Sequence, residues 1–254
     1  MASNPPAGAP QLPVLYKNLV PVSTEVHANY GVLPRDTLEI IRNIHAVPLT
    51  VDEFIMAQRN FPIVFASGPA TVPLCLMGLQ EGSNVFIKDD GKWPDFHYVP
   101  AYVRRHPFML VRLRPDSNEL SLCFDDTAPE VADNAGDRLF DNGQQTDVTR
   151  NIMKFCEEFE QSVIRTQQFI DEINKLGLLI DGEFSIQTPG QEKPSVYRGF
   201  RMVSEEKLRE LRGDQLRKME QNGMLGLIHA HLMSLSLIRE VFAREQIASQ
   251  RAAA

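Results

Sequence analysis

The sequence is poor in cysteine, with three in 254 residues. Cys75, Cys123 and Cys156 are far apart, and no pair has the Cys-x-x-Cys spacing of a zinc or redox site. The first two lie in apolar, strand-like runs, and the third lies on a helical pattern. We therefore expect buried free thiols in a reducing compartment instead of a disulfide framework.

The sequence also lacks an excess of positive charge, because 26 lysines and arginines face 33 acidic residues and leave a net charge of −7. Nucleic acids and anionic membranes attract positive surfaces, so this balance argues against both as the main partner. No basic start followed by a long apolar run opens the chain, and no window predicts a membrane span. We expect a cytoplasmic protein without membrane insertion, although export that reads a C-terminal signal would leave no mark at the N-terminus.

Local catalytic motifs are missing as well. The sequence has no Gly-x-Ser-x-Gly elbow, no phosphate-binding loop and no Gly-x-Gly-x-x-Gly. His229 and His231 are two residues apart on a predicted helix, which places them about 200° apart around its axis. They cannot share one metal ion. We therefore expect no catalytic residue and no cofactor.

One metal site is a possible alternative. Asp95 and His97 are two residues apart in an extended segment, so both point to the same side. With a distant third ligand, either His45 or His106, they would form the two-histidine, one-carboxylate site of a non-haem iron enzyme. Hydrogen-bonded structural roles for these residues are the other interpretation.

The hydrophobic pattern divides near residue 145. Before it, the chain is predicted to form short strands, including a pair joined by Gly68-Pro69 and a hairpin over residues 108–124. Thr50 and Glu53 have the spacing of a capping box at the start of a short helix. The first half therefore predicts a body rich in antiparallel sheet.

After this division the sequence is mainly helical. Apolar residues recur at a spacing near 3.5 over residues 148–176, which predicts a long amphipathic helix that ends before Gly177. Two further strands follow, and residues 224–243 predict a final helix that is apolar on much of its circumference. We expect an α+β fold in which the sheet-rich body packs against these two helices.

The predicted domain boundaries follow from the same patterns. Residues 1–13 are rich in proline, alanine and glycine and predict a flexible arm. Residues 14–243 predict one α+β domain, β-rich over 14–145 and mainly helical over 146–243. Residues 244–254 predict a frayed tail.

The most unusual stretch is "GKWPDFHYVPAYVRRHPFML", residues 91–110. Three prolines restrict the backbone, and Pro100 can start a helical turn. Stiff aromatic rings cost little entropy to immobilise, and arginines bind carboxylates with two parallel hydrogen bonds. The expected binding residues are Trp93, Phe96, Tyr98, Tyr102, Arg104 and Arg105. In the alternative interpretation the rings cover the sheet and the arginines pair with neighbouring acids.

Six segments of the chain resemble one known family. They are "FPIVF", "LCLMGLQEGSNVFIKDDGKW", "YVPAYVRRHPFML", "GLLIDGEFSI", "YRGFRMVSEEKLREL" and "NGMLGLIHAHLMSLSLI", and in this order they resemble the bacterial SapC family. The family is named for a component linked to the paracrystalline surface layer. The resemblance implies no catalytic residues. It implies an accessory role near genes for outer-membrane receptors and flavin-dependent halogenases.

These observations favour a non-catalytic binding or accessory protein that recognises a peptide, a carboxylate ligand or a protein partner. A first alternative is a surface-layer structural protein that is exported without an N-terminal signal. A second is the metal-dependent enzyme described above. The long helix would also allow a homodimer, through pairing with the same helix of a second copy.

Overall fold

A computed structural model describes residues 12–68, 70–114, 116, 119–187 and 194–253. Most of the predicted N-terminal arm therefore lies outside the described residues. The described chain forms two compact units, each built from two separate segments. Unit 1 contains residues 12–34 and 105–154, and unit 2 contains residues 35–104 and 155–253. Each unit takes residues from both the strand-rich and the helical half of the sequence.

Unit 1 is built from short antiparallel strands. One sheet has the order β1-β7-β6, a second has the order β8-β2-β9, and β10 pairs with β11. The hairpin of β6 and β7 confirms the prediction for residues 108–124, although most of its turn lies outside the described residues. The strands are β1 (Leu19–Pro21), β2 (Tyr30–Val32), β6 (Phe108–Val111), β7 (Ser121–Asp125), β8 (Val131–Asp133), β9 (Asp137–Arg138), β10 (Phe140–Asp141) and β11 (Gln144–Gln145).

A buried carboxylate fixes the centre of unit 1. Asp125 accepts hydrogen bonds from the backbone N–H of Lys17 at 2.6 Å and from the hydroxyl of Thr127 at 2.7 Å. Burial alone would raise the pKa of Asp125, but the hydrogen bonds from Thr127, Lys17 and Asn18 outweigh it and lower that pKa. The carboxylate therefore holds the segment before β1 against the end of β7.

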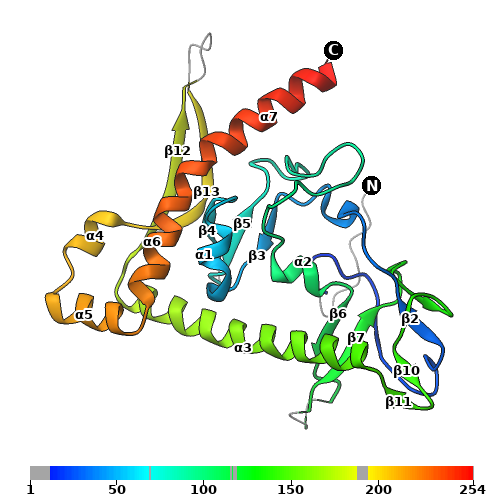
Figure 1. Ribbon diagram of the computed structural model, residues 1–254. Coiled ribbons are helices and arrows are strands. Elements are labelled where there is room, and N and C mark those ends of the chain that lie inside the picture. Colours follow the sequence, from blue (N-terminus) through cyan, green and yellow to red (C-terminus); the bar gives the residue numbers. More distant parts are fainter. Residues whose placement is uncertain (1–11, 69, 115, 117–118, 188–193, 254) are drawn as a thin grey trace. The chain divides into compact units, whose positions relative to one another are not determined.

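Unit 2 contains a five-stranded antiparallel sheet with the order β12-β13-β4-β5-β3 (Figure 1). The pairing of β4 with β5 confirms the hairpin predicted around Gly68, and β12 and β13 confirm the two later strands. The strands are β3 (Ala46–Pro48), β4 (Ile63–Ala66), β5 (Pro73–Leu76), β12 (Leu179–Ile186) and β13 (Ser195–Val203).

The helices of unit 2 include most of the long predicted helix. The helical elements are η1 (Glu39–Ile41), η2 (Val51–Glu53), α1 (Phe54–Ala57), α2 (Ala101–Arg105), α3 (Asp147–Lys175), α4 (Glu205–Arg209), α5 (Gly213–Gln221), α6 (Met224–Ser234), η3 (Leu235–Leu237) and α7 (Ile238–Ala253). Gly177 follows α3 with φ +66°, as predicted for a residue that ends a helix. The α+β prediction, with long helices in the second half of the chain, is therefore confirmed.

The C-terminal region differs from its prediction in two ways. The expected single helix over residues 224–243 is divided by the 3-10 turn η3 into α6 and α7. The expected frayed tail is instead helical, because α7 continues to Ala253. Glu245 on α7 is buried, and its Oε1 accepts the backbone N–H of Leu79 at 2.6 Å and of Gln80 at 3.2 Å. This helix therefore has a structural role that its polar sequence does not indicate.

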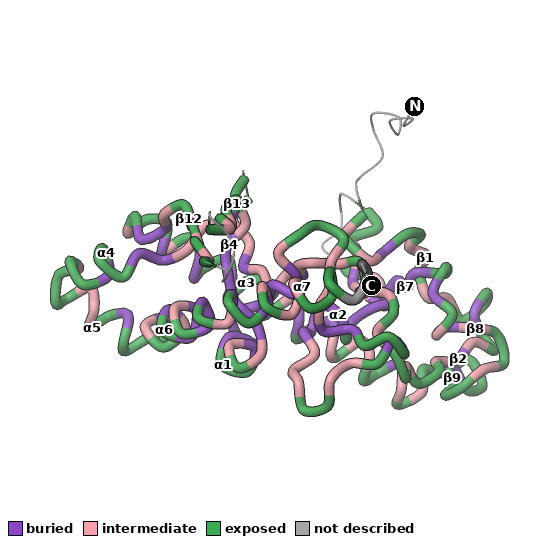
Figure 2. Tube along the Cα trace, turned by 90° about the horizontal axis from the view of Figure 1, so that it is seen from above, coloured by how far each residue is buried: buried purple, intermediate pink, exposed green. Residues whose placement is uncertain are grey.

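The sheet of unit 2 is covered on both faces. Val64 in β4 joins a buried cluster with Leu235 of η3 and Ile238 of α7. The next residue, Phe65, points to the opposite face and stacks on Phe169 of α3 at 6.5 Å between ring centroids. Figure 2 shows most of β4 buried, whereas α4 and α5 are largely exposed. The centre of the sheet is therefore the core of this unit.

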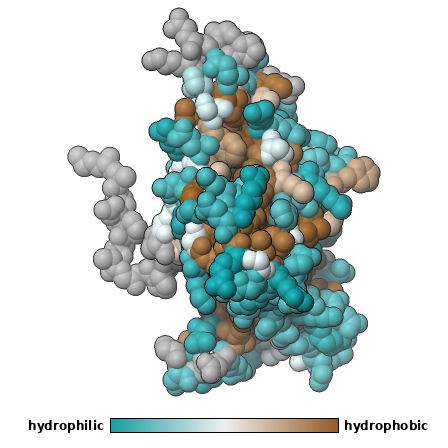
Figure 3. All heavy atoms as spheres, turned by 90° about the vertical axis from the view of Figure 1, so that its left-hand side faces the viewer, coloured by the Kyte–Doolittle hydropathy of each residue, from teal (hydrophilic) through white to brown (hydrophobic). Residues whose placement is uncertain are grey.

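The side of unit 2 that carries α4, α5 and the β12–β13 hairpin is not uniformly polar. Figure 3 shows hydrophobic residues gathered in the middle of this side, between hydrophilic margins.

The three cysteines are free and buried, as predicted. Burial raises the pKa of Cys75 well above its ordinary value and also raises that of Cys123, which keeps both thiols protonated at neutral pH.

One stretch, Met224–Gln250, is long and apolar enough to cross a membrane by length and composition, and 39% of its most apolar window is buried inside the protein. This differs from the expectation that no window of the sequence predicts a membrane span. This stretch contains His231 and Ser234, which are both buried and hydrogen-bonded to β4. In the structure one face of this stretch therefore packs against the sheet of unit 2.

His231 replaces a pair of main-chain hydrogen bonds in the sheet. β13 pairs with β4 at Phe200↔Ala66 and Arg201↔Phe65, and the same register would place Val203 opposite Ile63. Instead, the imidazole of His231 lies between these two residues. Its Nε2 accepts the N–H of Val203 at 3.0 Å, and its Nδ1 lies 2.8 Å from the carbonyl oxygen of Ile63.

The two hydrogen bonds define the state of this ring. Because Nε2 of His231 accepts a hydrogen bond, the proton of the neutral ring is on Nδ1, which donates to Ile63. Ser234 completes the junction, because its hydroxyl accepts the N–H of Ile63 at 2.9 Å and donates to the carbonyl of His231 at 2.6 Å. Burial lowers the pKa of His231 to about 4. The strands are thus joined by a neutral imidazole.

The free energy of unfolding should decrease as the pH is lowered, because of His231. Its pKa is 6.5 ordinarily and about 4 in the folded protein, so between these values the unfolded state binds more protons. We expect the free energy of unfolding to decrease by about 3 kcal/mol as the pH drops from 6.5 to 4. Urea titrations across this range should show this loss in the wild type and a much smaller one in His231→Gln.

The exposed neighbour His229 supplies the control on the same helix. His229→Gln should leave the stability within about 0.5 kcal/mol of the wild type and keep its pH dependence. Equal pH slopes for the wild type and His231→Gln would contradict this assignment.

Candidate functional site

The segment from Trp93 to Arg105, which the sequence singles out, combines a loop with the short helix α2. Pro100 starts the helical turn as predicted, because its carbonyl accepts the N–H of Val103 at 2.9 Å and of Arg104 at 3.0 Å. We call this stretch the 93–105 segment. Most of it belongs to unit 2, and Arg105 belongs to unit 1.

The buried carboxylate of Glu53 holds the 93–105 segment in place through hydrogen bonds. Glu53 is only 5% exposed, and its Oε2 accepts the N–H and the hydroxyl of Thr50 at 2.9 and 2.8 Å, which confirms the predicted capping box. Its other oxygen, Oε1, accepts the hydroxyl of Tyr98 at 2.9 Å and the N–H of Ala101 at 2.6 Å. A single side chain therefore starts one helix and holds the loop and the beginning of a second helix.

The hydroxyl of Tyr98 connects Glu53 to Arg104 by two hydrogen bonds. Burial, followed by the nearby Glu53, raises the pKa of Tyr98 to about 12, so its hydroxyl stays protonated and keeps donating to Glu53. The same hydroxyl accepts a hydrogen bond from Nη2 of Arg104 at 3.2 Å. The N–H of Tyr98 donates to the side chain of Asn60 at 3.0 Å. The loop is therefore held by both its backbone and its side chain.

Arg104 is exposed and lies over two aromatic rings. Its guanidinium carbon is 5.6 Å from the ring centroid of Tyr98 and 5.1 Å from that of Phe155 on α3. Its Nε donates to the carbonyl of Val99 at 3.0 Å. Within the described residues Arg104 forms no ion pair with a carboxylate. Its charge is thus oriented by the protein but not neutralised by an acid.

Phe96 is the most exposed aromatic residue of the described chain. Its side chain is 104% exposed, as open as in an extended peptide. Its backbone has φ +63°, a left-handed conformation that residues other than glycine rarely adopt. The ring is therefore presented to solvent by a constrained backbone, two residues from the anchored Tyr98.

The other predicted binding residues lie deeper in the protein. Tyr102 and Arg105 are each 5% exposed, and the guanidinium of Arg105 lies 6.0 Å from the ring of Tyr16 in unit 1. Trp93 is partly buried between Phe61 and Phe86, each at 5.9 Å between ring centroids. Arg105 and Trp93 therefore contact other residues of the protein, and Tyr102 is buried. The surface that the 93–105 segment presents is formed by Phe96, Arg104 and part of Tyr98.

The alternative metal site does not form among the described residues, which contain no group of three His, Cys, Asp or Glu able to hold an ion. Nδ1 of His97 lies 3.2 Å from the backbone carbonyl of Asp95. His106 is buried in unit 1, 3.9 Å from the carboxylate of Asp125. The backbone carbonyl of His45 accepts the N–H groups of Met77 and Gly78 at 2.7 and 3.0 Å. Within unit 2, His45, Asp95 and His97 therefore form no three-residue ligand group.

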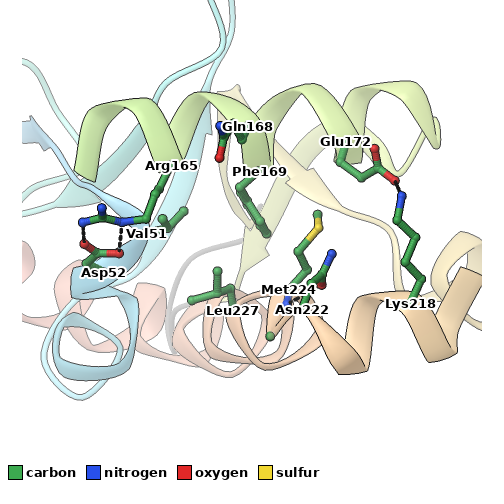
Figure 4. Close-up of a pocket in the computed structure, with 11 residues that line it drawn as sticks. Val51, Asp52, Arg165, Gln168, Phe169, Glu172, Lys218, Asn222, Met224 and Leu227 are labelled. Carbon is green, nitrogen blue, oxygen red and sulfur yellow. Dashed lines mark hydrogen bonds and ion pairs between the residues drawn. The ribbon is translucent and has the colours of Figure 1, made fainter. Parts of the chain in front are cut away.

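A groove between α3 and α5–α6 is a second concave feature of unit 2 (Figure 4). It has a volume of about 540 Å³, and its floor is formed by the apolar side chains of Val51, Phe169, Met224 and Leu227. The sequence analysis did not identify it, because its walls come from three distant segments. The helical spacing of residues 165–172 is a local signal, and it predicts only part of an amphipathic face.

Ion pairs close both ends of the groove. Arg165 binds the carboxylate of Asp52, and this hydrogen bonding lowers the pKa of Asp52. Lys218 lies 3.1 Å from Glu172 at the other end (Figure 4). Because each charge already has a partner, the groove offers an apolar floor with a neutralised rim. Such a surface can hold apolar side chains but does not select for a charge.

The fold and the site define an α+β protein with a rigid aromatic–arginine surface. A family model described as SapC matches residues 22–241 of this chain. The chain therefore belongs to the SapC family, as the six sequence segments predicted. No curated protein and no solved structure matches it.

We predict that Glu53 determines the order of the 93–105 segment. In Glu53→Gln an amide N–H₂ replaces one oxygen and faces hydrogen-bond donors, so the protein should lose about 2–4 kcal/mol of stability. Hydrogen exchange of the Ala101 amide should become faster, because this amide donates to Glu53. Glu157→Gln, at an exposed position on α3, is the matched control and should change neither quantity. An unchanged exchange rate at Ala101 would exclude the anchoring role.

Proposed function

We propose that this SapC-family protein is a non-catalytic binding protein whose recognition surface consists of Phe96, Arg104 and the accessible part of Tyr98. The observation that carries this proposal is the full exposure of Phe96 on a loop that Glu53 holds in place. Exposing a complete phenyl ring to water is unfavourable, and so is a left-handed backbone at phenylalanine. Both costs are offset when a partner buries the ring.

The composition of the surface supports a protein or peptide partner. Aromatic residues and arginine are enriched among the residues that contribute most to protein–protein binding. Phe96 would enter an apolar pocket of the partner, and Arg104, which lacks an acidic partner among the described residues, would bind a carboxylate. Because Tyr98 and Phe155 already orient the guanidinium, little entropy is lost when the complex forms.

This proposal predicts the effect of removing both exposed groups. Phe96→Ser combined with Arg104→Gln should abolish co-purification of the partner from cross-linked cells that produce the protein. Once the partner is known, its Kd should rise at least about 30-fold. The anchoring residues are unchanged, so the thermal unfolding temperature should stay within a few degrees of the wild type.

The matched control carries the same types of change on exposed helical positions of unit 2. Ile164→Ser combined with Arg209→Gln removes one exposed apolar side chain and one exposed arginine. This variant should retain the partner. If the Phe96/Arg104 variant co-purifies the same proteins as the wild type, the recognition surface is not located there.

We also propose that the protein acts in the cytoplasm as an accessory protein, and that the surface-layer alternative does not apply. The three buried free thiols support a reducing compartment. Fractionation of intact cells, with protease treatment of their surface, should leave the protein in the soluble, protected fraction. Recovery in a surface-layer extract would favour the structural alternative.

A further inference from the structure

A hollow in unit 1 has the properties of a ligand site that is independent of the 93–105 segment. It lies between the β1-β7-β6 and β8-β2-β9 sheets, beside the loop of residues 22–29, and has a volume of about 780 Å³. Pockets of this size accommodate small organic ligands. We call it the His27 pocket, after the buried histidine in its wall.

Three aromatic rings form one wall of the His27 pocket. His27 contacts Tyr30 and Phe124 at 4.9 and 5.1 Å between ring centroids, and Tyr30 and Phe124 are 6.3 Å apart. All three pairs are edge-to-face, which fixes the orientation of the rings. Phe124 and His27 are buried, and Tyr30 is the partly exposed ring that a ligand can touch.

His27 brings an unused polar atom to the pocket. The side chain is 7% exposed, and its Nδ1 accepts the backbone N–H of Ser23 at 3.1 Å. Burial lowers its pKa, so the ring is neutral and carries its proton on Nε2. This Nε2–H donates to no other group in the described part of the chain. Because this nitrogen is not itself fully buried, an acceptor in the pocket can reach it.

The charged residues that line the pocket all have the same sign. Asp126 and Asp133 contribute carboxylates, and no lysine or arginine of the described residues lines the cavity. Asp126 accepts a hydrogen bond from Asn18 and Asp133 accepts one from Asn134, both from neutral amides. Neither carboxylate forms an ion pair with a lysine or arginine of the described residues. The negative charge at the rim is therefore uncompensated, unlike that of the groove between α3 and α6.

We propose that the His27 pocket binds an organic cation, namely an ammonium or guanidinium group with a nearby oxygen acceptor. The cation would lie against the Tyr30 ring, which attracts positive charge through its π face. Asp126 and Asp133 would pair with it at the rim, and the oxygen of the ligand would accept the Nε2–H of His27. An anionic ligand would meet two carboxylates without a compensating charge, so the same arrangement rejects it.

The test compares cations with neutral molecules of the same shape, with the full chain as the receptor. N-acetylarginine amide and choline are the cations, and N-acetylcitrulline amide and 3,3-dimethylbutanol are their neutral counterparts. Amide NMR shifts should report binding at residues 23–30 and 124–133, and each cation should bind at least about tenfold more tightly than its counterpart. Tighter binding of the arginine derivative would point to a peptide side chain, and tighter binding of choline would point to a free amine.

The carboxylates are tested one at a time. Asp126→Asn and Asp133→Asn should each weaken cation binding about tenfold and leave the fold intact, because asparagine preserves the shape. Glu25→Gln, on the same loop but outside the pocket lining, is the matched control and should bind as the wild type does. Higher salt should weaken binding to the wild type more than to either asparagine variant.

Two results would overturn the proposal. The first is the absence of any shift in these residues at about 10 mM of either cation. The second is equal binding of the neutral counterparts, which would show that the pocket recognises apolar shape alone. Either result would leave the recognition surface at Phe96 and Arg104 untouched, because those residues belong to the other unit.

Discussion

The structure of unit 2 depends on one imidazole that takes the place of a peptide group. His231 receives the N–H of Val203 and donates to the carbonyl of Ile63, so β13 and β4 are joined through a helix at the point where they diverge. Unpaired backbone groups are costly in a buried sheet, and no apolar side chain could satisfy both. The bridge therefore lets α6 pack directly on the end of the sheet. The position of α6 in turn defines one wall of the groove beside α3.

Buried carboxylates solve the same problem in the irregular parts of the chain. Glu53, Asp125 and Glu245 each accept two or more hydrogen bonds from segments that lack regular partners. All three bind backbone N–H groups, which stabilise a negative charge without a positive residue. These segments are therefore held in place although none of the three carboxylates forms an ion pair with a lysine or arginine of the described residues. The exposed guanidinium of Arg104 is oriented by the rings of Tyr98 and Phe155 and forms no ion pair with a carboxylate of the described residues.

Local patterns in the sequence predicted the regular elements, and long-range contacts account for what they missed. The apolar spacing of α3 and the capping box of Thr50 and Glu53 were readable because they involve residues a few positions apart. The second role of Glu53, towards Tyr98 and Ala101, spans 45 and 48 residues and leaves no periodic signal. The sequence predicted that the 93–105 segment carries the binding residues, but it did not predict which of their side chains are exposed. Nothing in the residue types shows that Phe96 is exposed whereas Tyr102 is buried.

The order in which ribosomes make this chain gives the imidazole bridge a further meaning. Ile63 precedes His231 by 168 residues, and Leu79 precedes Glu245 by 166. The first strands of the sheet must therefore wait, with incomplete pairing, until residues 231 and 245 have been synthesised. Distant closures of this kind slow folding and prolong the exposure of apolar strands. Nascent chains of this protein should accordingly be clients of the chaperones that meet polypeptides at the ribosomal exit.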